Sequence, residues 1–145
     1  MDQLKEAMYY EKYEGRKVIC GLCPHECIIA PGKYGICRVR NNIEGILYTR
    51  NYGKISSIAM DPMEKKPLYH FFPGKYILSI GTVGCNFRCS FCQNYQIAQR
   101  GAAEQDIEDS FYEASGNYLL SLCRQEEDCI GLAYTYNEPS IWFEY

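Results

Sequence analysis

Three cysteines stand within eight residues, and their spacing is the most informative feature of the chain. Cys85, Cys89 and Cys92 form a C-x3-C-x2-C pattern, with the aromatic Phe91 directly before the last cysteine. Three thiolates can hold three irons of a cubane 4Fe-4S cluster, whereas a cubane that only carries electrons takes four. The last iron is then open to a ligand that is not protein, as in catalytic metal sites. These three cysteines, called the trio below, therefore predict a reactive cluster.

A structural zinc loop is the alternative interpretation of the trio. It would need a fourth ligand from elsewhere in the chain, such as His25 or His70. Zinc knuckles favour paired C-x2-C elements, and the trio contains one such element rather than two. We therefore favour the cluster.

A second group of four cysteines, called the quartet below, precedes the trio: Cys20, Cys23, Cys27 and Cys37. Four soft ligands in the pattern C-x2-C-x3-C-x9-C are enough to close a tetrahedral site, and closed sites usually serve structure. Zinc and a second 4Fe-4S cluster both suit four thiolates, so the spacing does not separate them. A cluster could relay electrons toward the trio, whereas zinc could only fix the local fold.

Unmetallated packing is the third alternative for the quartet. Residues 17–40 are rich in loop-forming residues and hold too few apolar side chains to make a core of their own, so we disfavour it. His25 lies inside the quartet and could replace one thiolate. A loop histidine is more often a hydrogen-bonding group, so we leave it out of the site.

Composition limits the classes of protein to which the chain can belong. It has 145 residues, nine cysteines and a net charge of -3, with basic residues scattered along it. This pattern predicts neither a nucleic-acid partner nor a membrane partner. The N-terminus lacks the layout of a secretory signal, so we expect a cytoplasmic protein. A reducing compartment favours metal ligation over disulfides.

In the N-terminal part, the sequence predicts mostly loops around two short regular segments. Apolar residues at helical spacing predict a helix over residues 2–13. Residues 46–50 and 54–59 are rich in β-prone side chains and predict a hairpin. Residues 61–74 carry three prolines and predict an ordered linker.

From residue 75 the pattern changes to strand, helix, strand. Residues 76–82 and 130–136 predict strands, and residues 106–123 predict the helix between them. Such a βαβ unit has parallel strands, so the trio and Glu138 both follow strand ends at one edge of a sheet.

We therefore expect an α/β fold, with residues 75–145 forming the start of a partial (β/α) barrel. A smaller cysteine-rich region with a β-hairpin, residues 1–74, would precede it. A complete eight-unit barrel takes roughly 250 residues, so we also expect the chain to be a fragment of a longer enzyme.

Four motifs spread along the chain resemble a known family. They are Cys20-Gly-Leu-Cys23-Pro-His-Glu-Cys27 with Gly35-Ile-Cys37, Asp61-Pro-Met-Glu-Lys-Lys-Pro-Leu-Tyr-His70, Gly84-Cys85-Asn-Phe-Arg-Cys89-Ser-Phe-Cys92-Gln-Asn94, and Tyr134-Thr-Tyr-Asn-Glu138-Pro139. The set resembles the radical S-adenosylmethionine (SAM) superfamily, in its pyruvate formate-lyase activating enzyme-like branch. Within that branch it resembles the radical SAM enzymes of the AmmeMemoRadiSam system.

The resemblance implies an activity and roles for particular residues. The trio would hold a 4Fe-4S cluster whose open iron binds SAM, and reductive cleavage of SAM would give a 5'-deoxyadenosyl radical. Phe91 would pack beside the adenine. Tyr136-Asn137-Glu138 is similar to a Gly-Gly-Glu stretch that contacts the SAM amino group; only Glu138 matches it by residue type.

The resemblance also implies partners. A flavodoxin or a ferredoxin would supply the electron. The substrate would be a glycyl-radical protein, another protein or a small molecule, and Memo-like and AMMECR-like proteins would be associated partners. The alternative from another class is a non-catalytic, zinc-stabilised protein-binding module, in which both cysteine groups hold zinc.

Overall fold

A computed structural model of the chain describes residues 4–101 and 111–145. In these residues the strands form four small open sheets. One sheet pairs β2 (Tyr10–Tyr13), β3 (Lys17–Cys20) and β4 (Ile28–Ile29), all antiparallel. A short 3-10 turn, Glu14–Arg16, joins β2 to β3.

A second antiparallel sheet packs beside the first and has the order β1-β6-β5. Its strands are β1 (Lys5–Glu6), β6 (Ile46–Thr49) and β5 (Arg40–Ile43). The two sheets share one core, formed by Ala7, Val18, Cys20, Ile29 and Leu47. Cys20 of the quartet is therefore part of a hydrophobic core.

The helix predicted over residues 2–13 is wrong wherever the structure describes that segment. The segment forms β1 and β2, and the Ala7 N–H donates to the Leu47 carbonyl over 2.8 Å. Tyr9 has a φ of 57°, which interrupts a right-handed helix. Pairing with neighbouring strands thus overrides the helical spacing of the apolar residues.

The predicted hairpin of residues 46–50 and 54–59 is also wrong. Residues 46–49 pair instead with β5, through a turn at Glu44 and Gly45 in which both residues have positive φ. Residues 54–59 divide between β7 (Lys54–Ile55) and the start of β8 (Ser57–Pro62). β7 pairs with β10 (Tyr112–Glu113) as a two-stranded sheet.

The fourth sheet has the order β11-β9-β8 and leads into the trio. The predicted strands at 76–82 and 130–136 are confirmed as β9 (Tyr76–Gly81) and β11 (Cys129–Tyr134), and they are parallel as expected. β8 pairs antiparallel with the other edge of β9, so the predicted linker of residues 61–74 begins inside a strand and continues through the 3-10 turn Met63–Lys65.

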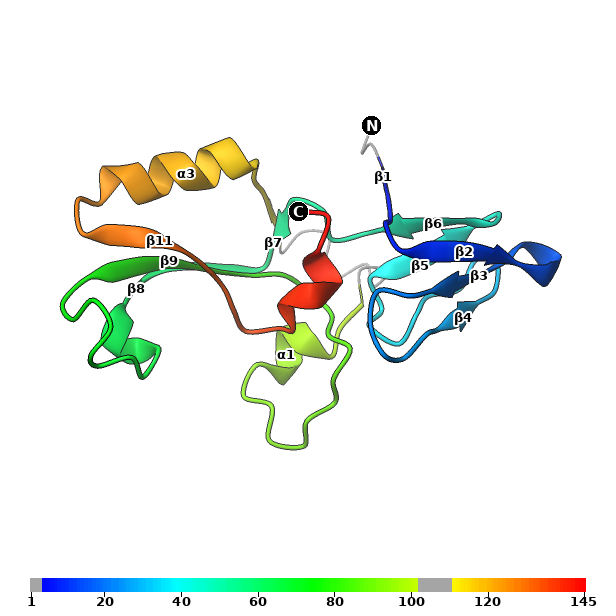
Figure 1. Cartoon of the computed structure of the whole chain (residues 1–145), viewed down its shortest axis with the longest axis horizontal. Helices are drawn as coiled ribbons and strands as arrows, with labels where there is room; N and C mark the ends of the chain where they lie inside the picture. Colours follow the sequence, from blue (N-terminus) through cyan, green and yellow to red (C-terminus); the bar gives the residue numbers. More distant parts are fainter. Residues whose placement is uncertain (1–3, 102–110) are drawn as a thin grey trace.

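The helix between β9 and β11 is shorter than predicted. Helix α3 spans Gly116–Gln125, and the Ser115 side chain caps it by accepting from the Tyr118 N–H. Residues 106–110 of the predicted helix lie outside the described residues. Figure 1 shows α3 along one face of β9 and β11, where Leu119 packs with Leu78 and Ile80.

The α/β fold class, with the start of a partial barrel, is corrected by these findings. The described residues form a mostly β structure with four small open sheets, and α3 and the one-turn α1 (Tyr95–Ala98) are its α-helices. No barrel is present among the described residues, because β9 and β11 form the only parallel pair there and β8 covers the remaining edge of β9 in the antiparallel sense. The boundary between residues 1–74 and 75–145 stays a prediction.

The sheets leave the trio's loop at the centre of the molecule. In Figure 1, β1–β6 gather at one end, β8, β9, β11 and α3 at the other, and the loop projects between them below the 3-10 turn Pro139–Trp142. None of the described helices is long and apolar enough to span a lipid bilayer.

The C-terminal turn is anchored in the core by Trp142. This side chain is 4% exposed, packs with Ile55 and Leu78, and donates its indole N–H to the Asn51 carbonyl over 2.7 Å. The neighbouring Phe143 is 53% exposed and only edges onto the ring of Tyr9.

We predict that Trp142→Ala lowers the free energy of unfolding by about 3–5 kcal/mol, because it opens a cavity in the core. Phe143→Ala should cost about 1 kcal/mol or less, because half of that ring is already in water. Urea unfolding of both variants measures the difference. Equal losses would contradict the assigned burial.

Candidate functional site

The trio lies in the loop that follows β9. Cys85 is buried and accepts a hydrogen bond from the Phe87 N–H at 3.4 Å, Cys89 is exposed and Cys92 is half-buried. The Cys92 N–H donates to the Cys89 carbonyl over 3.1 Å, which closes a turn between these two cysteines. One thiol is thus fixed at the root of the loop and two lie near its tip.

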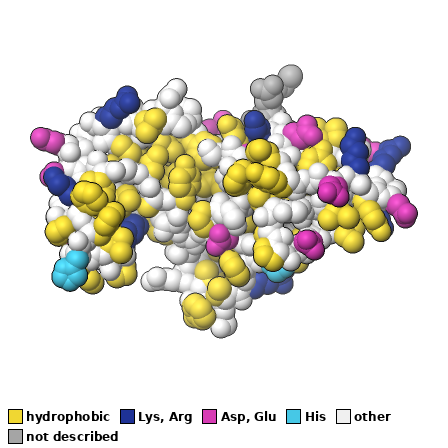
Figure 2. Space-filling model, in the orientation of Figure 1, with side chains coloured by type: hydrophobic (Ala, Val, Ile, Leu, Met, Phe, Trp, Pro, Cys, Tyr) yellow, Lys and Arg dark blue, Asp and Glu magenta, His cyan; other side chains and the backbone are white. Residues whose placement is uncertain are grey.

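Hydrophobic side chains cover much of the loop tip, at the bottom centre of Figure 2. Phe87 is 53% exposed and Phe91 is 86% exposed. An exposed aromatic ring beside thiols offers a flat apolar surface on which a ligand could stack. The predicted packing of Phe91 against adenine stays a prediction.

Asn137 clamps the root of the loop to the segment after β11. Its amide N–H donates to the Gly84 carbonyl over 2.8 Å, and its amide oxygen accepts from the Thr82 N–H at 3.2 Å. One side chain therefore satisfies two backbone groups that lie beyond the end of β9. No local pattern singles out Asn137, since asparagine is also common in turns.

Gly84 places the cysteine-rich segment directly against this root. Its φ is 80°, and a Cβ built there would lie 2.4 Å from the Cys37 carbonyl oxygen and 2.7 Å from Val39. Val83, Cys37, Val39 and Ile141 form a small core at the same place. The quartet and the trio are therefore joined by tight packing at Cys37 and Gly84.

Two further side chains support the loop from outside. The His25 Nε2–H donates to the Asn86 carbonyl over 2.8 Å, so this histidine of the quartet segment contacts the residue after Cys85. The Gln99 amide donates to the Phe87 carbonyl over 3.0 Å. This bond occupies one ring nitrogen of His25 and leaves the other free, so the exclusion of His25 from the ligand set stays a prediction.

Glu138 follows β11 at the same sheet edge as the trio. Its side chain is half-buried and accepts from the Ser140 N–H at 3.3 Å, so it caps the 3-10 turn that begins at Pro139. Pro139 opens that turn, as its fixed φ favours. The role of Glu138 toward the SAM amino group stays a prediction.

The quartet lines one cavity beside this root. Cys20 and Cys37 are buried, and Cys23 and Cys27 are half-buried around the same space. Burial raises the pKa of the Cys20 and Cys37 thiols, while backbone N–H groups and the Arg40 guanidinium act in the opposite direction. Four soft donors around one cavity suit a thiophilic metal.

Neither cysteine group is arranged as a finished metal site. Among the described residues, no three His, Cys, Asp or Glu side chains lie close enough together to share a metal ion. The donor chemistry of the quartet and of the trio fits a metal–thiolate centre, but binding requires the side chains to turn inward. The exposed tip of the trio's loop leaves room for this movement.

A polar cluster borders the segment after β11. The Lys65 and Lys66 ammonium groups lie 2.7 and 2.8 Å from the two carboxylate oxygens of the buried Asp61, and the Tyr136 hydroxyl donates to Asp61 over 3.4 Å. Burial raises the pKa of this carboxyl, but the hydrogen bonds from Lys65 and Lys66 outweigh it and hold the pKa well below its usual range.

The chain is 42% identical over 142 residues to an uncharacterized protein of Methanocaldococcus jannaschii. The match covers 98% of the chain and 41% of that protein, so the chain spans about two-fifths of the length of the curated relative it matches. No family model and no solved structure matches the chain.

Gly84→Ala and Gly74→Ala form a matched pair that tests the contact between the quartet and the trio. Both glycines have positive φ, but a Cβ at Gly74 meets nothing within 4 Å. Gly74→Ala should cost about 1–2 kcal/mol from backbone strain alone. Gly84→Ala should cost a further 1–3 kcal/mol, roughly, from overpacking. Chemical denaturation measures both, and equal costs would contradict the tight packing at Cys37.

Asp61 should make stability depend on pH. Its pKa is lowered by folding, so its contribution is present above the ordinary value of about 3.9 and is lost as pH falls through the folded-state value. The gap in unfolding free energy between the parent and Asp61→Asn should be largest near neutral pH and shrink below about pH 4. Asp128→Asn, at an exposed pair with Lys75, is the control. A gap that stays constant with pH would contradict this assignment.

Proposed function

We propose that the chain is part of a radical SAM enzyme in which the trio binds a 4Fe-4S cluster. The observation that carries the proposal is the C-x3-C-x2-C loop that starts four residues after β9 ends. Three thiolates leave one iron open, which suits a ligand with its own chelating groups. When bound, the cluster would supply the electron that splits the sulfonium of SAM.

The surroundings of the loop support this proposal. Asn137 and Gly84 fix its root, so the buried Cys85 has a set position while Cys89 and Cys92 can adapt to a cofactor. A rigid root with an adaptable tip is the arrangement expected of a site that must first assemble a cofactor and then admit a ligand. Phe91 at the exposed tip would contact the adenine of SAM.

Glu138 is the proposed contact to the SAM amino group. It follows the strand parallel to β9, so its carboxylate approaches the trio from the same sheet edge. Of its two oxygens, Oε1 accepts from Ser140. A second acceptor on the same carboxylate suits an ammonium group, which has three donors.

The proposed partners follow from the chemistry. Reduction of the cluster needs a one-electron donor such as flavodoxin or ferredoxin. The radical would abstract hydrogen from a protein or a small molecule, with a glycyl-radical protein as one candidate and Memo-like and AMMECR-like proteins as associated partners. A cytoplasmic location would keep the thiols reduced.

The direct test is an assay for 5'-deoxyadenosine. The protein at its full natural length is purified and reconstituted without oxygen, reduced, and incubated with SAM. We predict that 5'-deoxyadenosine forms and that Cys89→Ala abolishes it, because the cluster then loses one of three ligands. Cys129→Ala, a half-buried cysteine outside the trio and the quartet, should retain the activity.

Metal content separates this proposal from a zinc-stabilised binding module. The radical SAM proposal predicts brown protein that contains iron and sulfide and loses them in Cys89→Ala. Colourless protein that holds only zinc at both cysteine groups, with no 5'-deoxyadenosine, would favour the module.

A further inference from the structure

Arg40 is buried beside the quartet. Its side chain is 1% exposed, and together with Cys20, Cys23, Cys27 and Cys37 it lines the quartet's cavity. The cavity is small, about 10 Å³, and besides the four thiols and this guanidinium it is lined by the His25 ring and by aliphatic side chains. A permanent positive charge at such a place calls for a negative partner.

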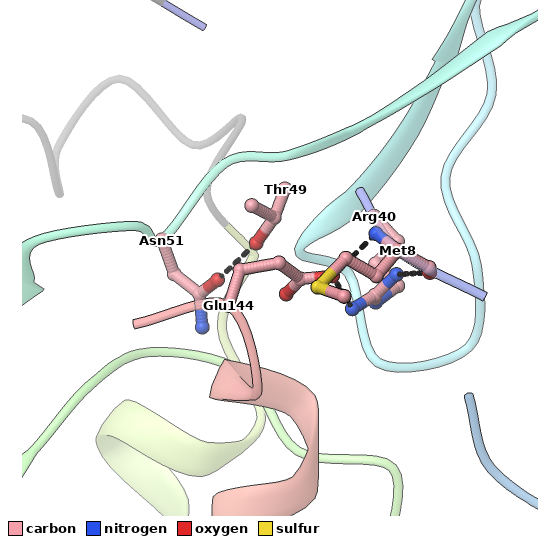
Figure 3. Close-up of polar contacts among 5 residues, drawn as sticks. All are labelled: Met8, Arg40, Thr49, Asn51 and Glu144. Atoms are coloured by element: carbon pink, nitrogen blue, oxygen red, sulfur yellow. Dashed lines mark hydrogen bonds and ion pairs between the residues drawn. The ribbon is translucent and has the colours of Figure 1, made fainter. Parts of the chain in front are cut away.

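Glu144 supplies one partner but leaves part of the guanidinium unsatisfied. As Figure 3 shows, Arg40 lies between Glu144 and Met8. One terminal N–H donates to Glu144 over 2.5 Å and the other to the Met8 carbonyl over 3.0 Å, while the Met8 N–H donates to Glu144 over 2.7 Å. The Arg40 Nε–H is buried and has no hydrogen-bond partner, and the second carboxylate oxygen of Glu144, Oε2, is likewise buried without one.

An unpaired, charged N–H in the interior is costly, and a bound ion is one of the arrangements that satisfy such a group in native proteins. A metal–thiolate centre is the ligand that the cavity suggests. Four thiolates around one divalent ion carry net negative charge, and the sulfur atoms accept hydrogen bonds. The unpaired N–H and the four thiols therefore complement each other.

We propose that the quartet binds one zinc ion as a buried anionic thiolate centre and that Arg40 is its counter-ion, with the Nε–H donating to a thiolate sulfur. Arg40 is a positioning residue here, not a metal ligand. The proposal concerns the quartet alone and does not depend on the radical SAM chemistry proposed for the trio.

The size of the cavity favours a single ion over a second cluster. A cubane adds four irons and four sulfides inside its ring of thiolates, whereas a tetrahedral zinc site needs room for one atom at about 2.3 Å from each sulfur. When the thiols turn inward, a space of about 10 Å³ has to change far less to admit a single ion than to admit a cubane. The tight contact of Cys37 with Gly84 limits expansion of the cavity on one side.

The experiment measures zinc at the quartet after the trio has been removed. In a background with Cys85, Cys89 and Cys92 all changed to serine, the chain is purified with zinc, and its affinity is measured by chelator competition. We expect one zinc per chain. Replacing Cys37 by serine as well should abolish it, because one of four ligands is lost.

Two changes at the ion pair test the role of Arg40 in opposite directions. Arg40→Met with Glu144→Met, which removes the pair without leaving a lone charge, should weaken zinc binding by about 10- to 100-fold, as the loss of an outer partner does at other metal sites. Glu144→Gln keeps an acceptor for Arg40 and Met8 but frees the positive charge for the thiolates. It should tighten zinc binding.

The exposed pair Arg16 and Glu44, with side chains 72% and 67% exposed, is the matched control, and Arg16→Met with Glu44→Met should leave zinc affinity unchanged. Glu144→Gln serves alone if the double methionine variant does not fold. Less than one zinc per chain, iron and sulfide at the quartet in its place, or equal zinc affinity in the parent and Glu144→Gln would each overturn the proposal.

Discussion

The packing of Gly84 against Cys37 is the constraint on which the rest of the structure depends. With a Cβ only 2.4 Å from the Cys37 carbonyl oxygen, no other residue fits there without moving one of the two segments. Because Gly84 directly precedes Cys85, this contact fixes where the trio's loop leaves the sheet. Because Cys37 belongs to the quartet, it also ties the geometry of one cysteine group to that of the other.

The region around Gly84 and Cys37 also holds the N-terminal sheets against the sheet of β8, β9 and β11. Arg40, three residues after Cys37 at the start of β5, pairs with Glu144 near the C-terminal turn, and both side chains are 1% exposed. A buried ion pair rarely adds much stability by itself. A fold that separated Arg40 from Glu144 would leave a buried charge unpaired, so the pair disfavours other arrangements of these two segments. Trp142 and Asn51 add a second link across the same region.

Sequence patterns predicted the strands that lead to the site but not the fold around it. β9 and β11 are rich in β-branched and apolar residues and were predicted correctly. β5 was missed because Arg40, Asn41 and Asn42 are polar residues typical of loops. Their side chains can be buried in β5 because hydrogen bonds satisfy the two asparagines and Glu144 pairs with Arg40. The two-residue turn at Glu44 and Gly45 was the available signal for that hairpin. The predicted helix of residues 2–13 failed because strand pairing overrode its apolar spacing.

Among the site residues, too, some could be proposed from the sequence and others only from the structure. Spacing alone predicts the trio and the quartet as metal sites, since thiol chemistry depends on residue type, and both stay predictions. Asn137, Gly84 and Arg40 act through contacts with residues far away in the sequence, which no local pattern records.

The most direct test of the central claim is electron paramagnetic resonance of the anaerobic, reduced protein with and without SAM. The account predicts a 4Fe-4S signal that changes when SAM is added and disappears when the trio is replaced by serine. The absence of a cluster signal, or a signal that SAM leaves unchanged, would contradict it.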